Sequence, residues 1–282
     1  MRSERLVDNT KAILSRYGFT ASKRFGQNFI TDRTVLEDIV RVSRLTKEED
    51  VLEIGPGLGT LTEYLAESAG RVCAVEADKK LIPVLKETLS RYDNIEIING
   101  DILKTDIVSL MKGRPFRIVA NLPYYITTPV IMSLLESHIP CRSITVMVQK
   151  EVGERMTAKP CNKSYGALTL AVNYYTDPAI IRTIPASSFI PSPKVDSVIV
   201  HMDVPEKPEV PVENEALMFS LIRGAFNQRR KTLVNALSGY EKLDIPKERL
   251  TEAIVLTGAK GTARGEELSL EQFARLADIL SE

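Results

Sequence analysis

A glycine-rich turn between an apolar run and an amphipathic run constrains the fold of this chain more than any other feature. The apolar run Val51–Ile54 predicts a buried strand, and the turn Gly55–Gly59 follows it directly. From Leu58 to Ala69 the apolar side chains recur at helical spacing. Strand, glycine turn and helix in this order are typical of a Rossmann-like α/β fold, which binds a nucleotide or nucleoside at the carboxyl edge of its sheet.

Polar residues stand at the ends of the apolar runs that follow this turn. Val72–Val75 is followed by Glu76, Ile95–Ile98 by Asn99, Gly100 and Asp101, and residues 118–120 by Asn121. A further strand is predicted for Ser143–Gln149. Because the carboxyl ends of parallel strands meet at one edge of a sheet, we expect these side chains to surround one cofactor.

The position of Glu53 indicates which cofactor that is. Glu53 lies two residues before the glycine turn, where a carboxylate is unfavourable beside a pyrophosphate but favourable beside a cation. S-adenosyl-L-methionine carries a sulfonium and an ammonium and has no phosphate, so it suits this position better than NAD. We expect Glu76 to bind its ribose and Asp101 its adenine amino group. A solvated Glu53 would leave NAD as the alternative.

The segment Asn121-Leu122-Pro123-Tyr124 predicts a site for an exocyclic amino group on a flat heterocycle. The Asn121 side-chain oxygen and the Leu122 carbonyl could accept its two hydrogens, and Pro123 ends regular pairing at that point. Tyr124 could stack on the ring, and Phe189 could supply a second aromatic wall. The alternative is a strand end followed by a turn, with both rings packed in the interior.

Composition excludes several classes of protein. The 282 residues are 44% hydrophobic and 26% charged with a net charge of zero, which is ordinary for a globular protein. No run approaches the roughly 18 apolar residues of a membrane span. The three cysteines are too scattered for a disulfide framework, and the two histidines lack ligand-like neighbours. We therefore expect a cytoplasmic protein without a metal.

Two basic clusters that contain no carboxylate are candidate nucleic-acid contacts on this neutral chain. One lies in residues 10–31 and includes Lys23 and Arg24, and the other lies in residues 221–233 and includes Arg229, Arg230 and Lys231. The alternative for each cluster is a solvated helix face.

Proline and acidic residues mark a boundary near the end of the chain. We expect an N-terminal extension over 1–31 that contributes to the cofactor site, a Rossmann-like domain over 32–203 and a linker over 204–212. For residues 213–282 we expect a small α-helical domain that binds RNA. This domain is expected to include one long helix over 216–237.

Six motifs in order resemble the ribosomal RNA adenine-N6 dimethyltransferases of the KsgA type. They are Phe25–Ile30, Glu53–Gly59, Glu76–Asp78, Gly100–Leu103, Asn121–Tyr124 and Phe189–Ser197, and Phe226–Leu233 with Arg264–Ser269 adds to the likeness. The resemblance runs from about residue 10 to the end of the chain.

The resemblance implies which residues act and on what. It assigns the cofactor contacts to Asn28, Ile30, Gly55, Glu76, Asp101 and Asn121, with Ile30 replacing a commoner leucine. It implies dimethylation of N6 of two adjacent adenosines in the 3′-terminal hairpin loop of 16S rRNA, on an assembly intermediate of the small ribosomal subunit. We expect a monomer without an obligate protein partner. The alternatives are a macrolide-resistance methyltransferase of 23S rRNA, a ribosome-assembly factor and a DNA adenine methyltransferase.

Overall fold

The computed structural model describes residues 5–19 and 26–282 of the 282-residue chain. It divides them into two compact units. The first, which we call the sheet unit, consists of the described residues up to Gly153 together with Pro178–Val204. The second, the helical unit, consists of Glu154–Asp177 and Pro205–Glu282.

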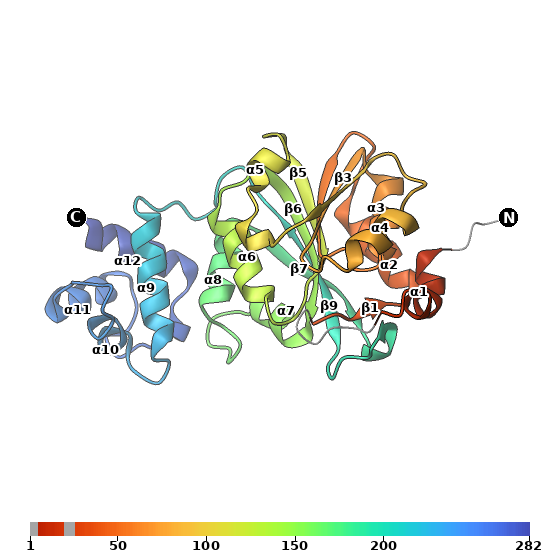
Figure 1. The fold of residues 1–282 in the computed structure, drawn as a ribbon. Helices are drawn as coiled ribbons and strands as arrows, with labels where there is room; N and C mark the ends of the chain where they lie inside the picture. Colours follow the sequence, from red (N-terminus) through yellow and green to blue (C-terminus); the bar gives the residue numbers. More distant parts are fainter. Residues whose placement is uncertain (1–4, 20–25) are drawn as a thin grey trace. The chain divides into compact units, whose positions relative to one another are not determined.

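The sheet unit contains a seven-stranded sheet with the strand order β4-β3-β2-β5-β6-β9-β7 (Figure 1). Strands β2 to β6 run parallel where they pair, and β9 is antiparallel to β6. A separate antiparallel pair joins β1 to β8. The strands are β1 (Phe29–Ile30), β2 (Asp50–Ile54), β3 (Arg71–Glu76), β4 (Ile95–Asn99), β5 (Phe116–Asn121), β6 (Cys141–Gln149), β7 (Asp177–Ile184), β8 (Phe189–Ile190) and β9 (Ser197–Asp203).

Helices connect the parallel strands, as parallel pairing requires. They are α3 (Thr60–Ser68), α4 (Leu81–Thr88), α5 (Ile107–Leu110) and α6 (Thr127–Glu136), with a 3-10 turn η3 (Ile102–Lys104) before α5. Helix α2 (Arg33–Ser43) precedes β2, and α7 (Lys150–Met156) follows β6. Asp32 caps the N-terminus of α2, because its carboxylate accepts a hydrogen bond from the Thr34 amide. Helix α2 packs against β5, β6 and β9.

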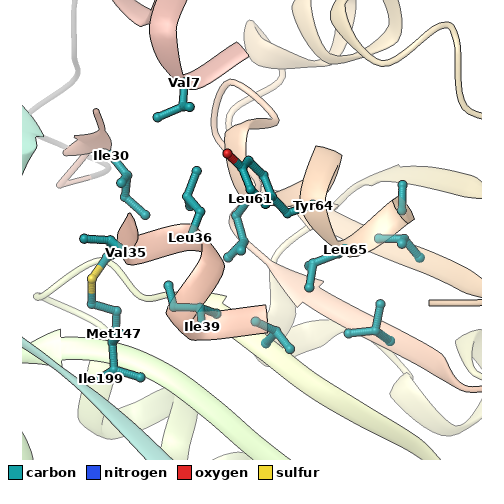
Figure 2. Close-up of a cluster of buried hydrophobic side chains, with 14 of the residues drawn as sticks. Val7, Ile30, Val35, Leu36, Ile39, Leu61, Tyr64, Leu65, Met147 and Ile199 are labelled. Carbon is teal, nitrogen blue, oxygen red and sulfur yellow. The ribbon is translucent and has the colours of Figure 1, made fainter. Parts of the chain in front are cut away.

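The core between α2, α3 and the sheet consists of aliphatic side chains from elements far apart in sequence (Figure 2). Leu36 and Ile39 of α2 and Leu65 of α3 are almost fully buried there, and Met147 and Ile199 reach it from β6 and β9. This core holds the strands in place, so the polar residues at the carboxyl ends of the strands have fixed positions.

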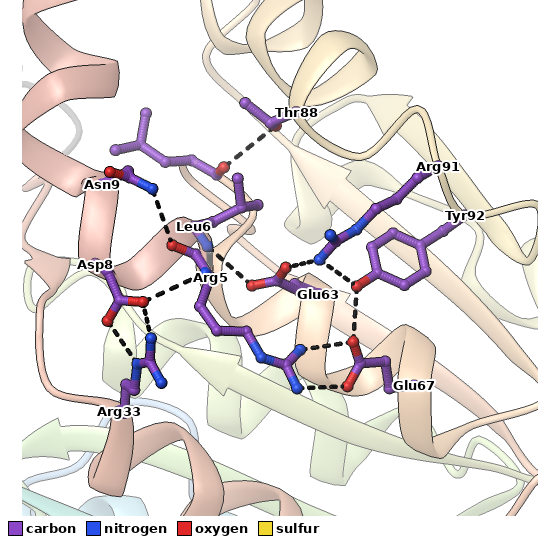
Figure 3. Close-up of polar contacts among 11 residues, drawn as sticks. Arg5, Leu6, Asp8, Asn9, Arg33, Glu63, Glu67, Thr88, Arg91 and Tyr92 are labelled. Carbon is purple, nitrogen blue, oxygen red and sulfur yellow. Dashed lines mark hydrogen bonds and ion pairs between the residues drawn. The ribbon is translucent and has the colours of Figure 1, made fainter. Parts of the chain in front are cut away.

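An N-terminal segment lies against α2 and α3 through ion pairs (Figure 3). It comprises the 3-10 turn η1 (Leu6–Asn9) and α1 (Thr10–Arg16). Arg5 donates two hydrogen bonds to Glu67 of α3, at 2.6 and 2.8 Å, and Asp8 pairs with Arg33 of α2. The buried Glu63 accepts the Leu6 amide and pairs with Arg91. This segment leads into residues 26–30 beside the glycine turn.

The helical unit differs in extent from the expected domain. Its helices are α8 (Ala167–Tyr175), α9 (Glu215–Asn227), α10 (Leu233–Ser238), α11 (Lys247–Leu256) and α12 (Leu270–Ser281), with a 3-10 turn η5 (Gly265–Glu267). Helix α8 packs on α9 and α12, so residues 154–177 belong with the C-terminal helices. The expected boundaries, which placed these residues in the Rossmann-like domain, are wrong at this point. The proline-rich segment after β9 does form an irregular connection, as predicted.

The expectation of one long helix over 216–237 is wrong. Helix α9 ends at Asn227, and α10 begins at Leu233 after a turn. Gln228 leaves the helical region with φ −131° and ψ 67°, and Thr232 is extended at the start of α10. Pro246 stands directly before α11, and Ser269 caps α12 by accepting the Gln272 amide.

Among the helices of the described residues, none is long and apolar enough to cross a membrane. Within the same residues no group of His, Cys, Asp and Glu side chains is placed to hold a metal ion.

Candidate active site

A cavity of about 510 Å³ lies at the carboxyl ends of β2, β3 and β5. It is lined by residues from each of these strand ends, by the glycine turn and by residues 26–30. The predicted residues that line it are Asn28, Ile30, Gly55, Glu76, Asp101, Asn121, Leu122, Pro123 and Tyr124. The structure therefore brings together in one cavity every predicted cofactor residue and all four residues of the Asn121 segment.

The glycine turn adopts backbone conformations that side chains rarely allow. Gly55, Gly57 and Gly59 have φ values of 71°, 62° and 85°. A Cβ atom added to Gly57 would lie 3.3 Å from the Phe29 ring, so the turn and β1 are in close contact. The turn is held by the Gly55 amide, which donates to the Val75 carbonyl at 2.9 Å.

Glu76 lies at the end of β3 with both carboxylate oxygens engaged. Its Oε2 accepts the Gly57 amide at 3.1 Å, and its Oε1 accepts the Asp78 amide at 2.8 Å. Burial raises the pKa of the Glu76 carboxyl above its usual range, although these amides oppose the shift. Each oxygen keeps a second lone pair, so Glu76 can also accept hydrogen bonds from the hydroxyls of a ribose.

Glu53 is buried rather than solvated, which removes the condition under which NAD was the alternative. Its side chain is 1% exposed and lines the cavity, and its Oε2 has no hydrogen-bond partner among the described residues. Burial, together with the nearby Glu76, raises the pKa of Glu53 to about 8. A buried carboxyl without a partner is costly when ionised, and a cation in the cavity would remove that cost.

Asn121 and Asn28 are joined by a hydrogen bond that orients the Asn121 side chain. Asn121 Nδ2 donates to the Asn28 carbonyl at 3.2 Å, which leaves Oδ1 without a partner among the described residues. The Leu122 amide donates to the Met147 carbonyl at 3.2 Å, so the backbone at this strand end is still tied to β6. The amide nitrogen is used for structure, and the amide oxygen remains as an acceptor.

The ring of Tyr124 is positioned by a residue that the sequence analysis did not single out for this purpose. The Tyr124 hydroxyl lies 2.8 Å from Oγ of Ser197, which is fully buried at the start of β9. Burial raises the pKa of Tyr124, so its hydroxyl is protonated at neutral pH. Ser197 belongs to the motif Phe189–Ser197, but only the three-dimensional structure reveals its contact with Tyr124.

The other two predicted cofactor residues, Asp101 and Ile30, line the cavity from different elements. Asp101 caps the 3-10 turn η3 by accepting the Leu103 amide at 3.1 Å and is otherwise exposed. Ile30 is buried and pairs with Phe189 between β1 and β8. It lines the cavity from β1, which suits a backbone or apolar contact.

Phe189 does not form the second wall that we expected. It is 3% exposed, lies in the core beside Ile30, and is absent from the cavity lining. The pairing with β1 explains this position, because Phe189 follows the 3-10 turn η4 (Ala186–Ser188) and packs inward opposite Ile30.

The candidate RNA-binding residues of the helical unit differ in their contacts within the protein. Arg229 donates to the carbonyls of Lys163 and Tyr165, at 2.9 and 2.7 Å, and pairs with Glu266. Its guanidinium therefore ties the turn after α9 to residues 163–165. Arg230 and Lys231 are exposed in the same turn. Lys23 and Arg24 lie outside the described residues.

Comparison with known proteins agrees with this geometry. The model of the family described as "Ribosomal RNA adenine dimethylase" matches residues 18–282. A "Ribosomal RNA small subunit methyltransferase A" from Lachnoclostridium phytofermentans is 54% identical, covering 97% of this chain and 96% of that protein. One from Clostridium acetobutylicum is 48% identical, covering 96% and 97%.

Two crystal structures are similar over most of the chain. A dimethyladenosine transferase from Plasmodium falciparum has a TM-score of 0.73 at 28% identity, covering 88% of this chain and 95% of its own. The 23S rRNA methyltransferase ErmE has a TM-score of 0.70 at 28% identity, covering 90% and 100%.

The fold and the cavity define an S-adenosylmethionine-dependent methyltransferase with a Rossmann-like sheet. The chain belongs to the ribosomal RNA adenine dimethylase family, and it is an rRNA adenine dimethyltransferase.

Proposed function

We propose that the enzyme dimethylates N6 of two adjacent adenosines in the hairpin loop near the 3′ end of 16S rRNA. The substrate would be an assembly intermediate of the small ribosomal subunit in the cytoplasm. The names of the two bacterial relatives, which both refer to the small subunit, support this choice of rRNA. The observation that carries the chemistry is the orientation of Asn121 by Asn28.

The amino group of adenine is a poor nucleophile because its lone pair is delocalised into the ring. Asn121 Oδ1 and the Leu122 carbonyl are two acceptors at one strand end, and together they can hold both amino hydrogens. An amino group held in this way turns its lone pair out of the ring plane. Tyr124, fixed through Ser197, can hold the ring by stacking.

The cavity has the groups that S-adenosylmethionine requires. This cofactor supplies an electrophilic methyl group when bound. Oε2 of Glu53, which has no hydrogen-bond partner among the described residues, can interact with a cationic group, and Glu76 can accept hydrogen bonds from hydroxyls. Asp101 can accept a hydrogen bond from the adenine amino group of the cofactor, and Asn28, Ile30 and Gly55 also line the cavity. We propose no general base, because the amine can release its proton to water after transfer.

RNA binding by the helical unit is assigned to Arg230 and Lys231. Arg229, which is itself exposed, holds the turn in place through its bonds to residues 163–165. Loop bases are not base-paired, so the target adenosine can leave its stack and enter the cavity at less cost than a paired base.

The similarity to ErmE makes 23S rRNA the second candidate substrate. Its identity of 28% is about half of the 54% shared with the small-subunit enzyme, which favours 16S rRNA. The sequences Gln228–Lys231 and Arg264–Ser269 in the helical unit also resemble the 16S group.

The decisive experiment is nucleoside mass spectrometry after incubation with S-adenosylmethionine. Unmethylated small subunits and naked 23S rRNA are treated in parallel. We expect N6,N6-dimethyladenosine in the 16S fraction alone. Product only in 23S rRNA would reject the 16S assignment and keep the chemistry, and monomethyladenosine as the end product would reject double transfer.

A further inference from the structure

The turn after Asn121 presents two successive tyrosines in different environments. The Ile126 amide donates to the Pro123 carbonyl at 3.2 Å, so Tyr124 and Tyr125 occupy the two central positions of a β-turn. Both rings line the cavity. Tyr124 is half-buried with its hydroxyl at Ser197, whereas Tyr125 is 56% exposed.

Tyr125 is exposed but not loosely placed. A Cβ atom added to Gly26 would lie 3.1 Å from Tyr125 Cδ1 and 3.5 Å from Cε1, so the ring packs directly on that backbone. Its hydroxyl makes no hydrogen bond to the described residues. An aromatic surface at the mouth of the cavity is therefore held in place from one side and open to solvent over more than half of its area.

The location of this ring distinguishes it from ordinary surface residues. Single exposed apolar side chains are common and need no explanation. Over residues 5–19 and 26–282, however, Tyr125 is the one aromatic side chain among the large exposed hydrophobic residues, the others being aliphatic. It also lies next to the ring that we assign to the target base.

We propose that Tyr125 is a stacking platform for the nucleobase that flanks the target adenosine. This inference rests on the proposed function, in which the target lies in a single-stranded loop. A base that leaves its stack to enter the cavity exposes the face of its neighbour. The Tyr125 ring can replace that lost contact, because every base has a π face. When the adjacent adenosines exchange places, the same ring would hold whichever of them is outside.

The kinetic test compares Tyr125→Ala with Tyr125→Phe on unmethylated small subunits. Stacking requires the ring and not the hydroxyl, so we expect Tyr125→Ala to lose about tenfold in kcat/KM, mostly through KM, and Tyr125→Phe to remain near wild type. Val108→Ala removes an exposed apolar side chain outside the cavity lining and serves as a matched control. The affinity for S-adenosylmethionine, measured by calorimetry, should be unchanged in Tyr125→Ala.

The absence of tryptophan from the chain allows a direct optical test. Tyr125→Trp introduces a single fluorophore at the platform, and Val108→Trp places one at an exposed position outside the cavity lining. A loop-bearing hairpin RNA, whose binding is followed independently by anisotropy of an end label, should quench Trp at 125 and not at 108.

Several results would overturn the proposal. Tyr125→Ala within twofold of wild type, or bound RNA that leaves Trp at 125 unquenched, would exclude stacking. Lost cofactor affinity in Tyr125→Ala would show that the ring instead supports the backbone at Gly26. If wild type methylates 23S rRNA and not 16S rRNA, the proposed substrate is wrong, and the same variants on 23S rRNA still decide the role of Tyr125.

Discussion

The buried Glu53 carboxyl makes cofactor affinity depend on pH in a way that one substitution should abolish. With its pKa at about 8, fewer than about one in ten Glu53 side chains is ionised at pH 7 in the unliganded protein. A cation in the cavity binds the ionised form, so a proton must leave as the cofactor enters. Below pH 7 each unit of pH should then change the affinity by up to about tenfold.

The magnitude can be worked out for a convenient range. Between pH 5.5 and 7.0 the dissociation constant of S-adenosylmethionine should fall about 30-fold, given a Glu53 pKa of about 8. Over this range the α-amino group of the cofactor stays protonated, since such groups titrate near pH 8. In Glu53→Gln the dependence should be nearly flat.

Calorimetric titration with S-adenosylmethionine in two buffers of different ionisation enthalpy measures both the affinity and the number of protons released on binding. We expect wild type to release about 0.9 proton at pH 7, and Glu53→Gln close to none, for a carboxyl pKa of about 8. A wild-type affinity that does not change over this range would refute the reasoning. So would the same dependence in Glu53→Gln, because another group would then be titrating.

The same carboxyl should affect the stability of the unliganded protein with a defined sign. Its folded pKa of about 8 exceeds the usual value of 4.5, so the unfolded chain gives up its proton first as pH rises. The contribution to stability is complete below about pH 4.5 and is lost progressively towards pH 8. The melting temperature of Glu53→Gln should therefore exceed that of wild type by an amount that grows with pH, and a constant difference would contradict this.

Three further predictions concern other residues. Asn121→Ala should lower kcat about 100-fold or more, because it removes one of two acceptors for the amino group, and single-turnover rates within twofold of wild type would contradict it. Ser197→Ala and Tyr124→Phe remove the same hydrogen bond, so each should lower the free energy of unfolding, measured by chemical denaturation, by about 1 kcal/mol. The double variant should lose no more than either single variant, and additive losses would exclude a shared contact. Arg229→Ala should lower the free energy of unfolding by about 1–2 kcal/mol, because it removes hydrogen bonds within the helical unit. Arg230→Ala should leave stability unchanged, weaken binding to the small subunit and reduce the salt dependence of that binding. An equal loss of stability in both variants would contradict a structural role for Arg229 alone.

The part of the site built on the sheet could be predicted from sequence because its signals are local. Glycines at 55, 57 and 59 indicate a turn with positive φ, and apolar runs locate the strands whose ends meet at one edge. The direction of parallel strands then places Glu76, Asp101 and Asn121 together without further information. The burial of Glu53 was the open point, and it depends on how α3 covers the strand.

The features that sequence analysis missed depend on contacts between distant segments. Phe189 was expected to form a second aromatic wall of the site, but the pairing of β8 with β1 places it opposite Ile30. Strand β7 was not predicted, since it lies at the edge of the sheet and most of its side chains are exposed. The break between α9 and α10 was hidden because apolar spacing continues on both sides of it.

The helical unit is assembled from two separate stretches of chain, and this limits where the chain could be divided into independent domains. The hydroxyl of Tyr165 donates to the Leu268 carbonyl at 2.9 Å, and α8 packs on α9 and α12. A ready-made domain fused after Val204 would lack Glu154–Asp177, and a sheet domain that ended at Val204 would carry that stretch with its apolar side chains uncovered. The two stretches therefore fold as one unit, although the last strands of the sheet lie between them in the sequence.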